Sequence, residues 1–206
     1  MSMCFEKIWK LGLVLALSSA SIAAHETGSG FHGLLVEPAK AIHPQTMMDH
    51  KGKAVNFPQR NERMKLVFFG YSSCPDVCPM TLQKVKSLMH RLGKAANELE
   101  FCFVSIDPLR DNTDQLNHFV SYYDPRITGF TGDPRAIKAL ENEFGILTRK
   151  FQGKSAFAYT LEHSVFLYLL NQEGQLRIMY PASMSVDAII KDIELLKVKG
   201  NSLARK

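Results

Sequence analysis

The sequence predicts an α/β fold in which a central mixed sheet is flanked by helices and followed by a C-terminal β-hairpin and helix. Two observations predict it. Between residues 54 and 161, short apolar runs typical of strands alternate with segments whose apolar residues recur at helical spacing. After residue 163, two strand-like runs follow each other directly before a final amphipathic segment. The first order is typical of parallel strands joined by helices, and the second adds an antiparallel pair at one side.

The predicted strands are continuous or nearly continuous apolar runs. "MKLVFFGY" (64–71) and "LEFCFVSI" (99–106) are apolar along most of their length, as expected of central strands covered on both faces. The hairpin is predicted by "SVFLYLL" (164–170) and "QLRIMYP" (175–181), which flank the turn "NQEG". Further strands are expected at residues 54–57, 127–130 and 157–161.

The predicted helices combine apolar periodicity with residues that favour helix ends. A proline suits the first helical turn because the N–H that it lacks has no partner there in any case. Serine, asparagine and aspartate suit the position before a helix, since their side chains accept backbone N–H groups. The favoured start residues are Pro79, Asn112 or Thr113, Asp133–Pro134 and Ser185. The expected helices occupy residues 79–92, 113–124, 134–144 and 186–200.

The N-terminal segment predicts export. Two lysines precede the apolar run "LGLVLALSSASIA" and small residues end it, which is the pattern of a secretory signal peptide over residues 1–24. An uncleaved anchor is the alternative, but the run of about 14 residues is shorter than the roughly 20 that span a membrane. We therefore expect an exported protein, periplasmic if bacterial. It would meet the inner membrane only through its partner or an uncleaved N-terminus.

After the signal peptide, the chain is expected to form a lead-in and one domain. Residues 25–44 are rich in glycine and lack periodicity, so they are expected to be loosely structured. Residues 45–206 contain all the predicted elements and are long enough for one substantial core. The formal net charge of +5 comes from scattered residues, and the lack of a Lys/Arg run argues against nucleic-acid binding.

The chemistry of the chain is concentrated in "FFGYSSCPDVCPMTL" (68–82), where Cys74 and Cys78 lie between a predicted strand and a predicted helix. Sites in α/β sheets collect at the carboxyl ends of strands, and a helix N-terminus favours thiolate over thiol. The spacing suits two sulfur ligands of one soft metal ion, while an irregular turn would also permit a disulfide. Cys102 lies within an apolar strand and is interpreted as a buried core thiol.

A metal site needs more than two thiolates, and copper(I) accepts either two sulfurs or two sulfurs and a nitrogen. Of the seven histidines, His90 and His118 lie in predicted helices and four others lie in the irregular front section. His163 directly precedes the apolar run 164–170, so a strand could hold its imidazole rigidly. The residues alone leave two interpretations of His163 open, a metal ligand and a packing histidine.

These residues also carry a resemblance to a known family. The segment 68–82 resembles the signature of the Sco/SenC family of thioredoxin-like copper-binding proteins. Further matches are "FVSIDPLRD" (103–111), "ITGFTGD" (127–133) and "LEHSVFLYLLNQEGQL" (161–176). The resemblance covers residues 45–198 and implies a thioredoxin-like fold. It also implies a site for Cu(I) or Cu(II) whose ligands are Cys74, Cys78 and His163.

The function that the resemblance implies is a copper metallochaperone that assists assembly of the binuclear copper centre of cytochrome c oxidase. The expected partner is the copper-bearing subunit of that oxidase, or another copper or thiol protein. The alternative is an enzyme, a thiol-disulfide oxidoreductase, that would use Cys74 and Cys78 as a redox pair without needing the histidine. A peroxidase of the peroxiredoxin type is disfavoured, because "YSSCPDVC" lacks the usual arrangement of residues.

Three aspartates near these motifs are expected to shape loops. Asp76 is expected to hold the loop between the cysteines by accepting backbone N–H groups, with an influence on the metal as the alternative. Asp107 and Asp111 are interpreted as loop-forming carboxylates, with partner docking as the alternative. The sequence departs from the family pattern in "YSSC" and in an N-terminus that is expected to be released; neither departure touches the implied ligands.

Overall fold

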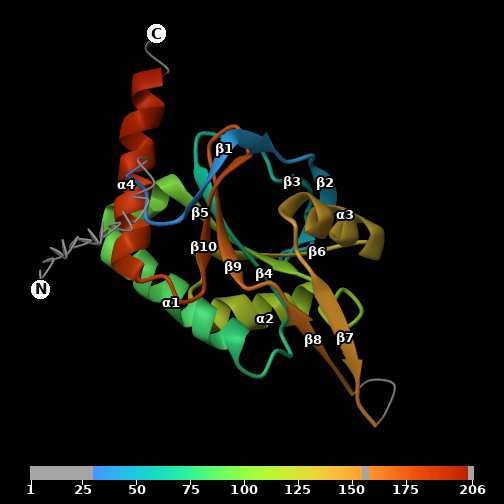
Figure 1. Ribbon diagram of the computed structural model, residues 1–206. Coiled ribbons are helices and arrows are strands. Elements are labelled where there is room, and N and C mark those ends of the chain that lie inside the picture. Colours follow the sequence, from blue (N-terminus) through green and yellow to red (C-terminus); the bar gives the residue numbers. More distant parts are fainter. Residues whose placement is uncertain (1–29, 155–157, 204–206) are drawn as a thin grey trace, which may run out of the picture. The chain divides into compact units, whose positions relative to one another are not determined.

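The computed structural model describes residues 30–154 and 158–203 (Figure 1). The expected signal peptide, residues 1–24, and His25 lie outside this range. A compact unit begins at Phe31 and contains an eight-stranded sheet and a separate two-stranded sheet. No helix of the described residues is long and apolar enough to cross a membrane.

The strands and helices follow one another in nearly the expected order. The strands are β1 (Leu34–Ala41), β2 (Gln45–Asp49), β3 (Ala54–Phe57), β4 (Met64–Gly70), β5 (Leu99–Ser105), β6 (Ile127–Thr131), β7 (Thr148–Gln152), β8 (Tyr159–His163), β9 (Phe166–Leu170) and β10 (Gln175–Pro181). The helices are α1 (Val77–Leu92), the 3₁₀ helix η1 (Gly93–Glu98), α2 (Thr113–Tyr123), α3 (Pro134–Phe144) and α4 (Val186–Leu203).

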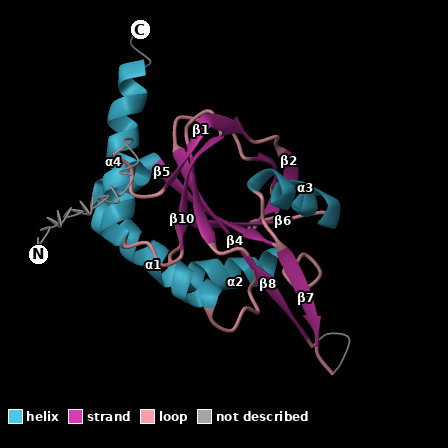
Figure 2. Cartoon of the chain, in the orientation of Figure 1, coloured by secondary structure: helices cyan, strands magenta, loops and turns pink. Residues whose placement is uncertain are grey.

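The centre of the large sheet consists of parallel strands. β4 pairs with β5 and β5 pairs with β6 in parallel, whereas the pairs β4–β9 and β9–β10 are antiparallel. The strand order is β1-β10-β9-β4-β5-β6-β2-β3. All seven residues of β4 are buried, because elements pack on both faces of the sheet there (Figure 2). The predicted parallel centre with an antiparallel pair at its side is confirmed.

Two hydrophobic clusters cover the two faces of this sheet. Phe68 and Phe103 pack on one face with residues of α1, α2 and α4, and Phe69 and Val104 pack on the other with residues of α3. Neighbouring residues of a strand point to opposite faces, so Phe68 and Phe69 belong to different clusters. Cys102 lies in the second cluster, and its burial raises the pKa of its thiol. The prediction of a buried core thiol is therefore confirmed.

The expected helix starts are confirmed at three of the four helices. The side chains of Asn112, Asp133 and Ser185 each accept a backbone N–H group from the first turn of the helix that follows. Helix α1 differs, because it begins at Val77 rather than Pro79. The earlier start places Cys78 within the first turn of α1.

Three strands, β1, β2 and β7, are not predicted by the sequence patterns. The expected loose structure of residues 25–44 is wrong over Leu34–Ala41, which form β1 and pair with β10. The register shifts between Leu35 and Lys40, and this irregularity breaks the alternation by which a strand is recognised. β8 also lies two residues later than expected, so that it ends at His163.

The segment before β1 is held against α4 by a buried carboxylate. Asp192 is 0% exposed and accepts the backbone N–H groups of His32 and Gly33, each at 2.8 Å. The ring atom Nδ1 of His32 lies 2.8 Å from the same carboxylate. Gly33 is in close contact with β10, since a Cβ there would lie 2.4 Å from Ile178 Cγ2. A contact between residues 160 positions apart thus orders this segment.

The first prediction concerns this contact. Asp192→Ala is expected to lower the free energy of unfolding by about 2–4 kcal/mol, because backbone N–H groups lose their buried acceptor. Urea denaturation measures the change. Asp187→Ala is the matched control, since this exposed carboxylate on the same helix pairs with Arg91 and contributes little. Equal destabilisation by the two variants would contradict the role assigned to Asp192.

Candidate metal centre

The structure brings the side chains of the three expected copper ligands into one place, with Cys78 and His163 in direct contact and Cys74 beside them. β4 ends at Gly70, and the loop that follows contains Cys74 and leads into the first turn of α1, where Cys78 lies. His163 is the last residue of β8. The distance from Cys78 Sγ to His163 Nε2 is 3.8 Å, although 85 positions separate the two residues.

The sulfur of Cys78 is packed against the end of β4. Its residue is 0% exposed and belongs to the hydrophobic cluster that contains Phe68 and Phe103. A Cβ at Gly70 would lie 2.7 Å from this sulfur, closer than packing allows. Only glycine at position 70 leaves room for the Cys78 sulfur at this depth.

Cys74 is half-buried and lies in a turn, where its backbone N–H donates to the carbonyl of Tyr71 at 3.2 Å. A hydrogen bond with the Cys78 side chain lowers the pKa of Cys74 to about 3, although partial burial acts in the opposite direction. Contacts with His163 and with the backbone N–H of Asp76 act in the same direction as the Cys78 bond. The bond between the sulfurs, together with burial, raises the pKa of Cys78. At neutral pH these opposite shifts favour Cys74 as the thiolate and Cys78 as the thiol.

The imidazole of His163 is oriented by its own chain. Its Nδ1–H donates to the carbonyl of Ser164 at 2.9 Å, which directs Nε2 toward Cys78. Ser164 is held in turn by Leu147, whose N–H donates to the serine hydroxyl and whose carbonyl accepts the serine N–H. The rings of Phe68 and Tyr71 lie 6.2 and 6.4 Å from the imidazole.

This donor set fits a soft metal ion. Two sulfurs and one imidazole nitrogen suit copper(I), and metal-binding histidines usually donate their other N–H to a carbonyl or carboxylate. Metal–sulfur and metal–nitrogen bonds of about 2.3 and 2.0 Å place two donors at most about 4.3 Å apart, and Cys78 and His163 meet this condition. In the described part of the chain, however, no three His, Cys, Asp or Glu side chains are grouped tightly enough to form a finished metal site.

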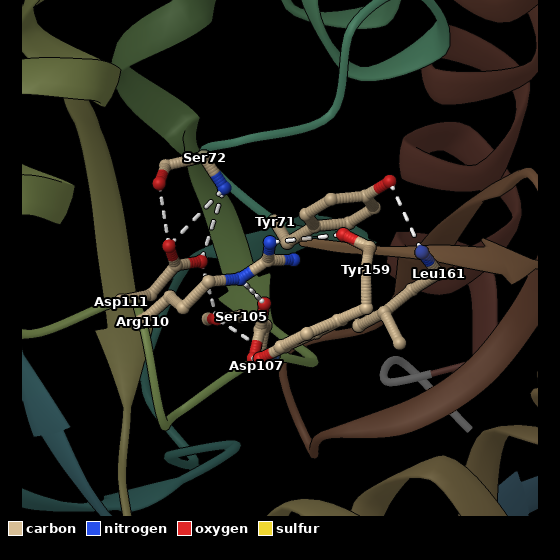
Figure 3. A network of polar contacts seen from close by, with 8 residues as sticks. All are labelled: Tyr71, Ser72, Ser105, Asp107, Arg110, Asp111, Tyr159 and Leu161. Atoms are coloured by element: carbon tan, nitrogen blue, oxygen red, sulfur yellow. Dashed lines mark hydrogen bonds and ion pairs between the residues drawn. The ribbon is translucent and has the colours of Figure 1, made fainter. Parts of the chain in front are cut away.

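The aspartates of the region have different roles from one another. The loop-holding role expected of Asp76 is wrong, because its side chain accepts no capping hydrogen bond and its backbone N–H, not its carboxylate, contacts Cys74. The loop role of Asp111 is confirmed. Its buried carboxylate accepts the N–H of Ser72 at 3.0 Å and the hydroxyls of Ser72 and Ser105 at 2.5 and 2.6 Å (Figure 3).

One residue of the site, Tyr71, is missed by sequence reasoning. Its buried hydroxyl accepts the N–H of Leu161 on β8 at 3.2 Å and contacts the side chain of Cys74. Burial raises the pKa of Tyr71, the N–H of Leu161 lowers it, and the nearby Cys74 and Cys78 raise it by smaller amounts. Its position three residues before Cys74 was the only signal available, and nothing in the local pattern distinguishes it from a core aromatic residue.

The chain matches one protein family over most of its length. Residues 36–197 match the family model described as SCO1/SenC. The chain belongs to the SCO1/SenC family. The match includes all three residues of the candidate centre in this SCO1/SenC protein and confirms the resemblance carried by its motifs.

Relatives and solved structures agree with this assignment. A SCO2-like protein of Rickettsia felis is 30% identical over 153 residues, which cover 73% of each chain. The structure of ScoI from Bradyrhizobium japonicum, solved with copper bound, is 28% identical, with a TM-score of 0.69 over 75% of this chain and 98% of that one. The apo Sco1 protein of Thermus thermophilus is also 28% identical, with a TM-score of 0.72 over 81% and 96% of the two chains. The thioredoxin-like fold is thereby confirmed.

The second prediction concerns the reactivity of Cys74 in this SCO1/SenC protein. Its alkylation by iodoacetamide is expected to change little between about pH 5 and pH 7, because the thiolate is the nucleophile and its pKa lies below that range. An ordinary thiol, with a pKa of about 8.5, slows about tenfold per pH unit on acidification. Mass spectrometry of the modified peptides measures the rate.

Cys78→Ala provides the control, since it removes the hydrogen bond that contributes most to the low pKa of Cys74. In this variant the Cys74 rate is expected to fall as the pH falls. Cys102 is expected to stay unmodified throughout because it is buried. A wild-type rate that follows the titration of an ordinary thiol would contradict the charge state assigned to the pair.

Proposed function

We propose that this SCO1/SenC protein is a copper metallochaperone that binds one copper ion through Cys74, Cys78 and His163. The observation that carries the proposal is the 3.8 Å separation of Cys78 Sγ and His163 Nε2, with the side chain of Cys74 beside them. Metal binding would release the proton that Cys78 holds, because only thiolates are good ligands. With a neutral imidazole, Cu(I) would form a singly negative complex and Cu(II) a neutral one, so both oxidation states are compatible with the site.

Copper delivery is the second part of the proposal. The B. japonicum ScoI structure is described with copper bound, which supports copper as the cargo of this chain. Cys74 is the more exposed of the two sulfurs, so a partner's ligand would meet the ion from that side. The proposed partner is the copper-bearing subunit of cytochrome c oxidase, or another copper or thiol protein. The proposed location is outside the cytoplasm, following a signal peptide at residues 1–24.

A second candidate function, thiol-disulfide exchange, is supported by the unequal sulfurs. The Cys74 thiolate would attack a partner's disulfide, forming a mixed disulfide and releasing one partner thiolate. Cys78 would then lose its proton and attack the Cys74 sulfur. This second step forms the Cys74–Cys78 disulfide and releases the partner's other cysteine, so that the partner is reduced as this pair is oxidised. His163 is not needed for either step.

The third prediction separates the two functions through His163. His163→Ala is expected to weaken copper(II) binding strongly, because two thiolates leave this ion short of donors, and to weaken copper(I) binding less. Exchange of the cysteine pair with a small dithiol is expected to change little. Copper(II) titration by absorbance and equilibration with glutathione measure the two properties. His118→Ala is the matched control, since this histidine lies exposed on α2.

Two outcomes would count against the metallochaperone. Full copper(II) affinity in His163→Ala would identify His163 as a packing histidine. A variant that loses copper yet still supports oxidase assembly in cells would leave thiol reduction as the function.

The fourth prediction concerns oxidation. Reduced protein is expected to bind one copper ion per chain with sulfur and nitrogen donors in its X-ray absorption spectrum. Formation of a Cys74–Cys78 disulfide is expected to abolish this binding reversibly, because a disulfide is a poor ligand. Peptide mapping of the oxidised protein tests the pairing. Coordination by oxygen and nitrogen alone, or a disulfide to the buried Cys102, would refute the proposed ligand set.

A further inference from the structure

The strand that carries His163 lies outside the large sheet. Within the described residues, β8 pairs with β7 in a separate two-stranded sheet, and this ribbon extends away from the large sheet (Figure 1). Cys78 belongs instead to the helix that follows β4. The large sheet constrains His163 from one side only, because β9 begins three residues after it and pairs with β4. On the other side, β8 itself is held against the rest of the molecule by side-chain contacts.

Three side chains of the main body hold β8 (Figure 3). The carbonyl of Tyr159 accepts Nη1–H of Arg110 at 3.0 Å, and the Tyr159 hydroxyl donates to Asp107 at 2.6 Å. The N–H of Leu161 donates to the Tyr71 hydroxyl at 3.2 Å. Residues 159, 161 and 163 lie on the same face of β8. The two residues that are held are therefore the two that precede His163 on that face.

Arg110 makes the most contacts of the three. Its guanidinium carbon lies 3.7 Å from the centre of the Tyr159 ring and 5.5 Å from that of Tyr71, and its Nε–H donates to Asp107 at 2.5 Å. The arginine side chain is 19% exposed and the Asp107 side chain 4%, so water screens this pair weakly. Charge-assisted hydrogen bonds and cation–π contact together fix Tyr159 in one position.

The loop that contains Arg110 also holds the cysteine segment. Asp111, the next residue, accepts the N–H and the hydroxyl of Ser72, two positions before Cys74. The loop after β5 thus contacts the cysteine loop through Asp111 and the histidine strand β8 through Arg110.

We propose that Arg110 is a positioning residue that sets the distance between His163 and the cysteines and thereby tunes the site toward copper(II). The inference rests on the proposed function, because it assumes that His163 binds copper. Lysine cannot replace Arg110 in this role: a single ammonium group cannot bond Asp107 and the Tyr159 carbonyl in a fixed planar geometry while stacking on the tyrosine ring.

The test is Arg110→Lys, which keeps the charge beside the buried Asp107. Copper(II) affinity is expected to fall about 10–100-fold, as when outer-shell partners of a metal ligand are lost, while copper(I) affinity changes little. The control is Lys150→Met. The Lys150 ammonium lies 3.8 Å from the same Tyr159 ring but comes from β7 and bonds nothing near the cysteines. This variant is expected to keep the wild-type copper(II) affinity.

A double-mutant cycle shows whether Arg110 acts through His163. In a His163→Ala background, Arg110→Lys is expected to cause no further loss of copper(II) affinity, because the ligand that it positions is gone. An equal loss with and without His163 would overturn the proposal, since the effect would then pass through the cysteines.

A measurement without copper keeps the inference separate from the proposed function. Hydrogen exchange of the Leu161 amide is expected to be faster in Arg110→Lys than in wild type or Lys150→Met, whereas amides of β4 keep their protection. Unchanged exchange at Leu161 together with wild-type copper(II) affinity would overturn the role of Arg110. If His163→Ala alone leaves copper(II) affinity intact, the proposed ligand set fails. Unchanged exchange at Leu161 would then by itself overturn the claim that Arg110 fixes β8.

Discussion

The parallel pairing of β4 with β5 is the constraint on which the site depends. It places Gly70 opposite Ser105, and both strands end there. The N–H of Ile106 donates to the Gly70 carbonyl at 2.8 Å, so the loops after the two strands begin side by side. Buried polar groups need hydrogen-bond partners. At this edge Asp111, from the loop after β5, accepts hydrogen bonds from Ser72, in the loop after β4.

Burial gives the two sulfurs different properties. Cys78 is enclosed by the core and by the end of β4, whereas Cys74 is half-buried and receives hydrogen bonds that favour its thiolate. A soft ion and a partner's disulfide would both meet the same outer sulfur first. Copper transfer and thiol exchange would therefore require the same pair, an outer thiolate and a buried thiol. The two functions differ in whether they require His163.

Local patterns in the sequence were sufficient for much of the fold. Strands such as β4 and β5 are apolar over most of their length because both faces are covered, and Asn112, Asp133 and Ser185 act as caps within their own segments. The edge strand β1 could not be found in this way. Its irregular register and the buried anchor of the segment before it depend on residues far along the chain.

Local patterns are enough to place two cysteines where a buried strand passes into a helix, and a histidine before another buried strand, because periodicity and end signals are local. The folded structure was needed to find that Cys78 and His163 lie 3.8 Å apart, that Gly70 makes room for the sulfur, and that Arg110 joins the loop after β5 to β8. These are contacts between segments distant in sequence. They follow from how buried groups pack and find hydrogen-bond partners, which no local pattern records.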